Sequence, residues 1–174
     1  MEKDIKRGFD PERLDKKLAG FETAPASDEE CMARVLQLAE KARELDEVPV
    51  GAMVVVRGRI VSEAYNLREH SGIATHHAEV LAIEEASRAL GGWRLPQSTL
   101  YVTLEPCLMC AGAAINARVE RIVFGAEDIR FGALGSLIDV SELSLNHKPE
   151  VKGGVLKEEC KDVMQSYFKR KRAK

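Results

Sequence analysis

The spacing of apolar positions along the chain changes from helical to strand periods, and the first element that it predicts is a helix. Ser27 and Glu30 form a capping box at its start. Apolar residues then recur at three- and four-residue spacing as far as Leu45, which predicts a helix over 28–46. The apolar run at 48–56 predicts a strand, and residues 60–65 its hairpin partner across a turn at 57–59.

Helical and strand patterns alternate through the rest of the chain. They predict a helix from His77 to about Leu90, a strand over 99–104, a helix from Cys107 to about Asn116 and a strand over 121–124. Residues 66–76 are expected to form a loop. After a glycine-rich connection, a fifth strand is expected at 150–155 and a terminal helix at 156–172. This order predicts a three-layer α/β/α sandwich around a mixed five-stranded sheet with a largely parallel half.

The N-terminal residues differ from the rest of the chain. We interpret residues 1–26 as an N-terminal extension and residues 27–174 as one domain. Charged residues of both signs alternate in the extension around a few apolar positions, which are Ile5, Phe9, Leu14 and Leu18. A short helix packed on the core and a loosely held arm fit this pattern equally. The sequence assigns the extension no function.

Composition places the chain among globular proteins. A length of 174 residues predicts one domain with a real core, and 45% hydrophobic and 31% charged residues are ordinary values. No apolar run is long enough for a membrane span, and the charged N-terminus lacks a signal-peptide pattern, so we expect a cytoplasmic location. The net charge of −2 argues against a generally basic nucleic-acid coat, although five of the last six residues are positive.

Four cysteines fit a reducing compartment. Cys107 and Cys110 share a CxxC motif, which in such a compartment indicates metal binding or redox chemistry rather than a disulfide framework. Cys31 and Cys160 stand alone in the sequence and are interpreted as small buried apolar residues.

The candidate chemistry lies in His77-Ala78-Glu79, followed thirty residues later by the CxxC motif. His77, Cys107 and Cys110 supply three zinc ligands, and three protein ligands leave the fourth tetrahedral position open, as in catalytic zinc sites. The CxxC motif begins a predicted helix, where the helix dipole favours the thiolate form that binds metals. Glu79 is then free to move protons for a water activated by the metal.

This interpretation makes a geometric demand. Residues two apart in a regular helix point to different sides, so His77 and Glu79 reach one site only if His77 lies at the very start of its helix. Both predicted helix starts follow a β element, and their ends can therefore meet at one edge of the sheet, where α/β proteins commonly bind substrates.

A structural zinc site is the alternative. It needs a fourth protein ligand, for which the candidates are Cys31, Cys160, His70, His76 and His147. It would make the protein a zinc-stabilised binding module with no role for Glu79. The two motifs together, each at a predicted helix start, favour the catalytic interpretation, and His76 is interpreted as a loop or rim residue.

The two motifs match the H-x-E…P-C-x-x-C signature of zinc-dependent nucleobase deaminases. Other segments extend the match, and with them the chain resembles the bacterial tRNA-specific adenosine deaminases of the cytidine and deoxycytidylate deaminase superfamily over residues 28–172. These segments are Glu47-Val48-Pro49-Val50-Gly51, Asn66, residues 103–113, Val123-Phe124-Gly125-Ala126 and Gly135-Ser136-Leu137.

The resemblance implies a cytidine-deaminase-like fold and hydrolytic deamination of the wobble adenosine of a tRNA anticodon to inosine. It implies one zinc ion per subunit on His77, Cys107 and Cys110, with Glu79 as the proton carrier, and a homodimer. It further implies substrate-binding roles for Asn66, Asp128, Phe168, Lys171 and Arg172. Deamination of free bases or nucleosides, such as guanine or cytidine, is the alternative that shares the signature, whereas residues 103–105, residues 135–137 and the basic tail favour RNA.

Overall fold

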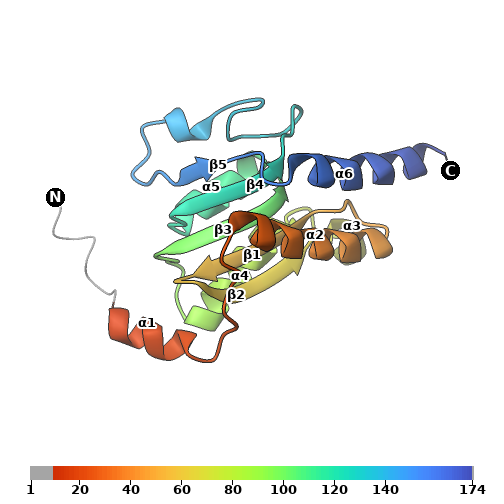
Figure 1. Ribbon diagram of the computed structural model, residues 1–174. Helices are drawn as coiled ribbons and strands as arrows, with labels where there is room; N and C mark the ends of the chain where they lie inside the picture. The colour runs from red at the N-terminus through yellow and green to blue at the C-terminus, as the bar shows by residue number, and fades with distance from the viewer. Residues whose placement is uncertain (1–9, 174) are drawn as a thin grey trace.

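A mixed five-stranded sheet forms the centre of the protein, in a computed structural model that describes residues 10–173 (Figure 1). The strands lie in the order β2-β1-β3-β4-β5. The first three are antiparallel neighbours, while β3, β4 and β5 run parallel, which confirms the predicted mixed sheet with a parallel half. The strand bounds are Gly51–Val56 for β1, Arg59–Tyr65 for β2, Ser98–Leu104 for β3, Arg121–Ala126 for β4 and Glu150–Lys152 for β5.

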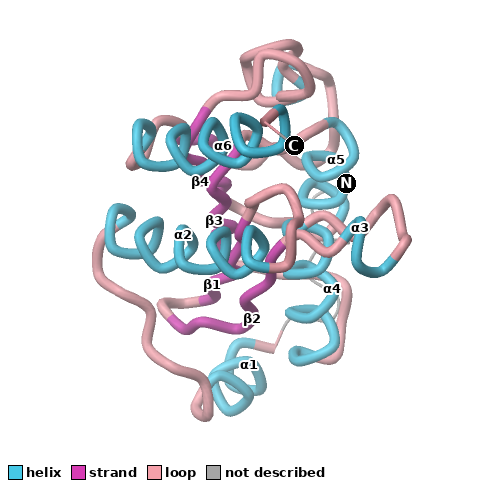
Figure 2. The backbone as a smooth tube through the Cα atoms, turned by 90° about the vertical axis from the view of Figure 1, so that its right-hand side faces the viewer, coloured by secondary structure: helices cyan, strands magenta, loops and turns pink. Residues whose placement is uncertain are grey.

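Helices cover both faces of the sheet and complete the three predicted layers (Figure 2). On one face lie α2 (Asp28–Glu44) and α6 (Lys157–Arg172), and on the other lie α4 (Ala78–Leu90) and α5 (Leu108–Asn116). The capping box at the start of α2 is present, because the Ser27 hydroxyl accepts from the Glu30 N–H and the Glu30 carboxylate accepts from the Ser27 N–H. Among the described helices, none combines the length and apolar character that crossing a membrane requires.

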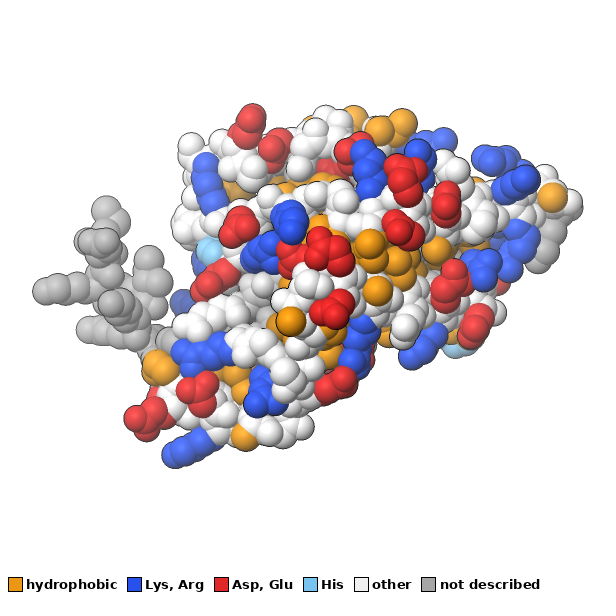
Figure 3. All heavy atoms as spheres, in the orientation of Figure 1, with side chains coloured by type: hydrophobic (Ala, Val, Ile, Leu, Met, Phe, Trp, Pro, Cys, Tyr) orange, Lys and Arg blue, Asp and Glu red, His pale blue; other side chains and the backbone are white. Residues whose placement is uncertain are grey.

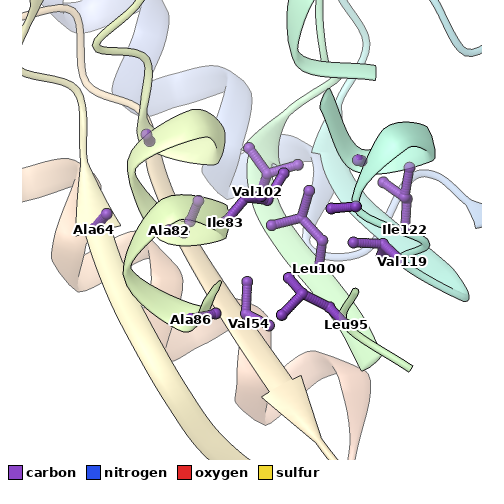
Figure 4. Packing of buried hydrophobic residues seen from close by; sticks show 14 of the residues in the cluster. Val54, Ala64, Ala82, Ile83, Ala86, Leu95, Leu100, Val102, Val119 and Ile122 are labelled. Carbon is purple, nitrogen blue, oxygen red and sulfur yellow. The ribbon is translucent and has the colours of Figure 1, made fainter. Parts of the chain in front are cut away.

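Small side chains let the layers approach closely. Ala82 and Ala86 of α4 pack over Val54 and other buried strand residues (Figure 4). On the opposite face, Gly51 lies directly under α2, and a Cβ there would come within 2.3 Å of the carbonyl oxygen of Val35. Close packing of this kind explains why alanine and glycine occupy these positions of an otherwise branched apolar core.

The main difference from the predicted elements lies in residues 66–76, which are not entirely loop. Residues Arg68–Ser71 form a short helix, α3, which ends at Gly72 in the left-handed conformation with φ 67°. A distant side chain stabilises its first turn, because the Glu47 carboxylate accepts from the backbone N–H groups of Glu69 and His70 at 3.2 and 2.5 Å. Local sequence patterns carry no trace of such a contact.

The described part of the N-terminal extension contains a helix, α1 (Pro11–Leu18), which Asp10 caps through the N–H groups of Glu12 and Arg13. Leu14 and Leu18 are buried in the main core cluster. Lys17 donates a hydrogen bond to the Leu90 carbonyl at the end of α4, and Asp15 pairs with Arg57 of the β1–β2 turn at 2.6 Å. Residues 1–9, which include Ile5 and Phe9, lie outside the described residues, as does Lys174.

Candidate active site

Two helix starts bring the candidate metal ligands together. His77 immediately precedes α4 and Cys107 immediately precedes α5, both with extended backbone, while Cys110 lies in the first turn of α5. The ligand atoms of these three residues all lie within 4.8 Å of one another. The Nδ1 atom of His77 is 3.7 Å from the Cys107 Sγ and 3.5 Å from the Cys110 Sγ. The arrangement is a donor set of one imidazole nitrogen and two sulfurs around a common point.

The charge state of the two sulfurs suits a cation. A hydrogen bond from the Cys110 thiol and a second from His77 lower the pKa of Cys107 to about 4, although burial opposes the shift. The same contact with Cys107, together with burial, raises the pKa of Cys110. One thiolate is therefore formed at neutral pH, and a divalent cation that replaces the shared proton would stabilise both sulfurs as thiolates.

Glu79 lies beside this group without belonging to it. It is the second residue of α4, its side chain is only 4% exposed, and it is not among the residues whose ligand atoms cluster. Burial raises the pKa of its carboxyl to about 7, above the ordinary 4.5. A carboxyl group that titrates near neutral pH is suited to both accepting and donating a proton.

The backbone at His77 meets the geometric demand that the sequence made. His77 caps α4 with φ −73° and ψ 150°, so its side chain is not held to helical directions. It can therefore face the two sulfurs while Glu79, inside the first turn, stays off the ligand set.

None of the candidates for a fourth protein ligand belongs to this group. Cys31 and Cys160 are buried in the cluster between the sheet and the layer of α2 and α6, on the face opposite α4 and α5. The Nε2 atom of His147 lies 2.6 Å from the Val119 carbonyl oxygen. Within residues 10–173, the group around His77 holds no fourth histidine, cysteine or carboxylate. This composition is that of a site with an open coordination position.

Asn66 immediately follows β2, whose end approaches the segment that carries His77. The Leu67 N–H donates to the His76 carbonyl oxygen at 3.1 Å, which places the end of β2 beside His77. The Asn66 side chain is buried, and its Nδ2 donates to Oε2 of Glu47 at 3.0 Å. Glu47, which is fully buried, therefore holds both Asn66 and α3. In the sequence, Glu47 belongs to a segment that resembles the family, and no local pattern indicates its role.

Asp128 lies in the loop that follows β4, and its carboxylate is engaged within that loop. It accepts hydrogen bonds from the N–H groups of Arg130 and Phe131 at 2.9 and 3.2 Å. In this structure, Asp128 therefore shapes the turn that carries the exposed Phe131 side chain.

The three tail residues lie in the last turns of α6, where basic side chains gather at one end of the molecule (Figure 3). All three side chains are exposed, and Lys171 also pairs with Asp46 at 2.6 Å. Tyr167 adds a hydrogen bond from its hydroxyl to the Asp46 carbonyl oxygen at 2.9 Å. The end of α6 is thus fastened to the residue that precedes Glu47.

The geometry of this site agrees with the similarity of the chain to known proteins. Residues 26–172 match the MafB19-like deaminase family, to which the chain therefore belongs. It is 49% identical over 148 residues to a tRNA-specific adenosine deaminase of Bacillus subtilis (strain 168), which covers 84% of this chain and 92% of the relative. It is 44% identical over 147 residues to a tRNA-specific adenosine deaminase of Haemophilus influenzae, with 83% and 85% covered.

A solved structure from a study of A-to-I editing by tRNA:A34 deaminases superposes with a TM-score of 0.73 at 41% identity. It covers 76% of this chain and 96% of that chain. The resemblance to tRNA-specific adenosine deaminases and the expected cytidine-deaminase-like fold are both confirmed.

Proposed function

We propose that this protein is a zinc-dependent hydrolase that converts the wobble adenosine of a tRNA anticodon to inosine and releases ammonia. One observation carries the proposal, which is the convergence of His77, Cys107 and Cys110 beside a buried carboxyl group, Glu79. The relatives named as tRNA-specific adenosine deaminases support tRNA as the substrate.

Zinc is the metal that fits the donor set. One imidazole and two thiolates are borderline-soft ligands, which zinc accepts in tetrahedral sites. Bound by these residues, zinc supplies a Lewis acid that makes water nucleophilic near neutral pH. Both sulfurs lie at the start of α5, where the positive end of the helix dipole stabilises their thiolate forms.

Glu79 performs the proton transfers in this proposal. Its ionised carboxylate takes a proton from the attacking water and delivers it to N1 of the adenine ring, while the water oxygen bonds to C6. Glu79 next transfers the remaining hydroxyl proton to the exocyclic amine, the C6–N bond breaks, and ammonia leaves. A pKa of about 7 makes both protonation states of Glu79 accessible at neutral pH.

The other expected residues hold the substrate. Asn66, oriented by Glu47, would hydrogen-bond the base edge. Asp128 and Phe168 would contact the anticodon loop, with the exposed aromatic ring available for stacking on an unpaired base. Lys171 and Arg172 would neutralise phosphates, and Lys171 must exchange its Asp46 partner to do so.

A homodimer in the cytoplasm belongs to the same proposal. Apolar side chains are exposed at the start of α5 and in the loop that follows β4, next to the metal group. They are Leu108, Met109, Ile129 and Phe131. Large apolar side chains that are exposed in neighbouring segments are typical of an interface, and a second copy of the chain would cover them.

The substrate class is tested directly. The protein is incubated with a tRNA that carries adenosine at the wobble position, with the same tRNA carrying guanosine there, and with free adenosine, cytidine and guanine. We expect inosine at the wobble position of the first tRNA and no turnover of the others. Ammonia released only from the free bases or nucleosides would contradict the proposal and support the free-base alternative.

A further inference from the structure

We propose that Glu105 is a positioning residue whose buried carboxylate fixes residues 127–138, here called the 127–138 loop, against the metal site and thereby determines how the anticodon loop is bound. The inference rests on the proposed function for its substrate. Its structural part concerns the protein alone and can be tested without RNA.

Glu105 collects donors from across the loop. It lies between β3 and Cys107, and it is 2% exposed. Its Oε1 accepts from the N–H groups of Leu134 and Ser136 at 2.9 and 3.1 Å. Its Oε2 accepts from the Asp128 N–H at 3.1 Å and from the Ser136 hydroxyl. All of these donors belong to the 127–138 loop, so one carboxylate joins its beginning to its later part.

The main chain beside Glu105 holds the same loop from the other side. The Glu105 N–H donates at 2.8 Å to the carbonyl oxygen of Ala126, the residue of β4 from which the loop begins. Within the loop, the Ala133 N–H donates to the Pro106 carbonyl oxygen at 2.9 Å. Gly132 forms a bridge with Cys107, one of the candidate metal ligands. The loop therefore lies along residues 105–107, the segment that leads into the metal site.

Gly132 shows how closely the loop encloses the carboxylate. A Cβ at this position would lie 2.4 Å from Oε2 of Glu105 and 2.5 Å from the Asp128 carbonyl oxygen. No side chain fits there, because both neighbours are part of the hydrogen-bonded arrangement. The close packing of the loop around the Glu105 carboxylate therefore requires glycine at position 132.

A carboxylate is an unfavourable residue to bury when its role is purely structural. Its desolvation destabilises the fold unless hydrogen bonds compensate, and an apolar side chain of similar size would avoid that cost. Here the compensation comes from the loop itself, so the charge determines the conformation of the loop. The consequence reaches the surface, where the turn after Asp128 presents Ile129 and Phe131 with exposures of 77% and 67%.

The test compares Glu105→Gln with Glu120→Gln, a matched change at an exposed glutamate that accepts the Gln97 N–H. A glutamine has one acceptor oxygen, so part of the donor set in the 127–138 loop would face an NH₂ group. Amide hydrogen exchange at Leu134 and Ser136 is measured without RNA. Zinc content is then measured, followed by kcat and KM on a synthetic anticodon stem-loop RNA with adenosine at the wobble position.

For Glu105→Gln we expect amide exchange in the 127–138 loop to accelerate by about tenfold or more, since a lost hydrogen bond to a charged group is worth about 1.5–3 kcal/mol. We expect KM for the stem-loop to rise by about tenfold on the same scale, with zinc content unchanged and kcat less affected. Glu120→Gln should change none of these quantities. Unchanged exchange in the loop, or equal losses of kcat and zinc, would overturn the proposal.

Ser136→Ala keeps the inference testable if Glu105→Gln fails to fold. It removes one hydroxyl donor and leaves the backbone donors in place. We expect faster amide exchange at Leu134, which both proteins share, and a KM increase of about threefold. Exchange and KM that both stay at the wild-type values would overturn the proposal. Should the wild-type protein not edit tRNA, the proposed function fails, while the exchange measurement still decides whether Glu105 fixes the loop.

Discussion

The two ends of the sheet bury different kinds of side chain. At the metal end, where α4 and α5 begin, acids and an amide are buried, namely Glu47, Asn66, Glu79 and Glu105. At the arm end, where α1 meets the β1–β2 turn and the last turn of α4, the buried residues of α1 are Leu14 and Leu18. The charged groups there, such as the Asp15–Arg57 pair, stay near the surface.

The buried polar residues of the metal end serve the reaction, whereas the buried apolar residues of the arm end stabilise the fold. Buried acids destabilise the fold. At the metal end they serve as a proton carrier, Glu79, and as two carboxylates that hold α3 and the 127–138 loop, Glu47 and Glu105. The arm end gains free energy by covering apolar surface, at about 25 cal/mol per Å². Substitutions at the two ends should therefore affect different measurements, and the following predictions test this from the largest expected effect to the smallest.

Cys110→Ser should have the largest effect, and it should fall on the metal end. Serine is a poor ligand for zinc, so zinc retention and inosine formation should both be lost. Zinc per chain is measured by atomic absorption alongside the tRNA assay. The matched control is Cys31→Ser, on the opposite face of the sheet, which should retain zinc. Equal zinc loss in both variants would contradict the assigned ligand set.

Leu14→Ala and Leu18→Ala address the arm end. Each removes a buried side chain from the contact between α1 and the core, and each should lower the free energy of unfolding by about 2 kcal/mol or more. Urea denaturation measures this loss, and kcat on tRNA at low temperature should stay at the wild-type value. Leu45→Ala, at an exposed position, serves as the control. A fall in kcat in a folded Leu14 or Leu18 variant would show that the two ends are not independent.

Asp28 tests an ionic contribution to stability at the arm end, where β4 and β5 begin. Arg121 donates to both of its carboxylate oxygens at 2.7 and 2.8 Å, and these bonds, with lesser ones from Lys152 and Tyr101, hold the pKa of Asp28 well below its usual 3.8. Because the pKa of Asp28 is lower in the folded than in the unfolded protein, its carboxylate stabilises the fold fully at pH values above the unfolded-state pKa. This stabilisation decreases as the pH falls from the unfolded-state pKa towards the folded-state pKa.

Asp28→Asn should therefore lower the free energy of unfolding by about 1–3 kcal/mol at neutral pH. The gap between the variant and the wild type should narrow as the pH falls below about 4, because protonation then weakens the wild type as well. Urea denaturation at several pH values measures both curves. A gap that is constant across the acidic range would contradict the assigned role of the carboxylate charge.

Lys171→Ala should have the smallest effect. The side chain lies near the surface and pairs with Asp46, so its loss should raise KM for tRNA only about two- to threefold and reduce the salt slope of log KM by about one. Asp46→Asn should shift KM in the opposite direction by freeing the cation. An increase in KM for both variants would show that the pair itself, rather than the charge of Lys171, matters for binding.

The sequence predicted most of the metal end because its signals are local. His77, Glu79 and the CxxC motif are short patterns, and their placement at helix starts followed from the periodicity around them. The roles of Glu47 and Glu105 were not predictable in this way. Their partners are chiefly backbone N–H groups more than twenty positions away, which leave no mark on residue type.

For the N-terminal extension, the sequence predicted two alternatives, a short helix packed on the core and a loosely held arm. Leu14 and Leu18 have helical spacing, but a helix of eight residues is marginal in isolation and forms here against the core. The tertiary contacts that decide between a packed helix and a loose arm, such as the bond from Lys17 to the Leu90 carbonyl, lie far along the chain.

One measurement tests most directly whether Glu79 moves protons without binding the metal. Glu79→Gln is prepared alongside the wild type, and zinc per chain and inosine formed in tRNA are measured on the same samples. The account predicts wild-type zinc content with inosine formation lost, since a glutamine cannot carry the proton. Loss of zinc from the variant, or inosine formation at the wild-type rate, would contradict it.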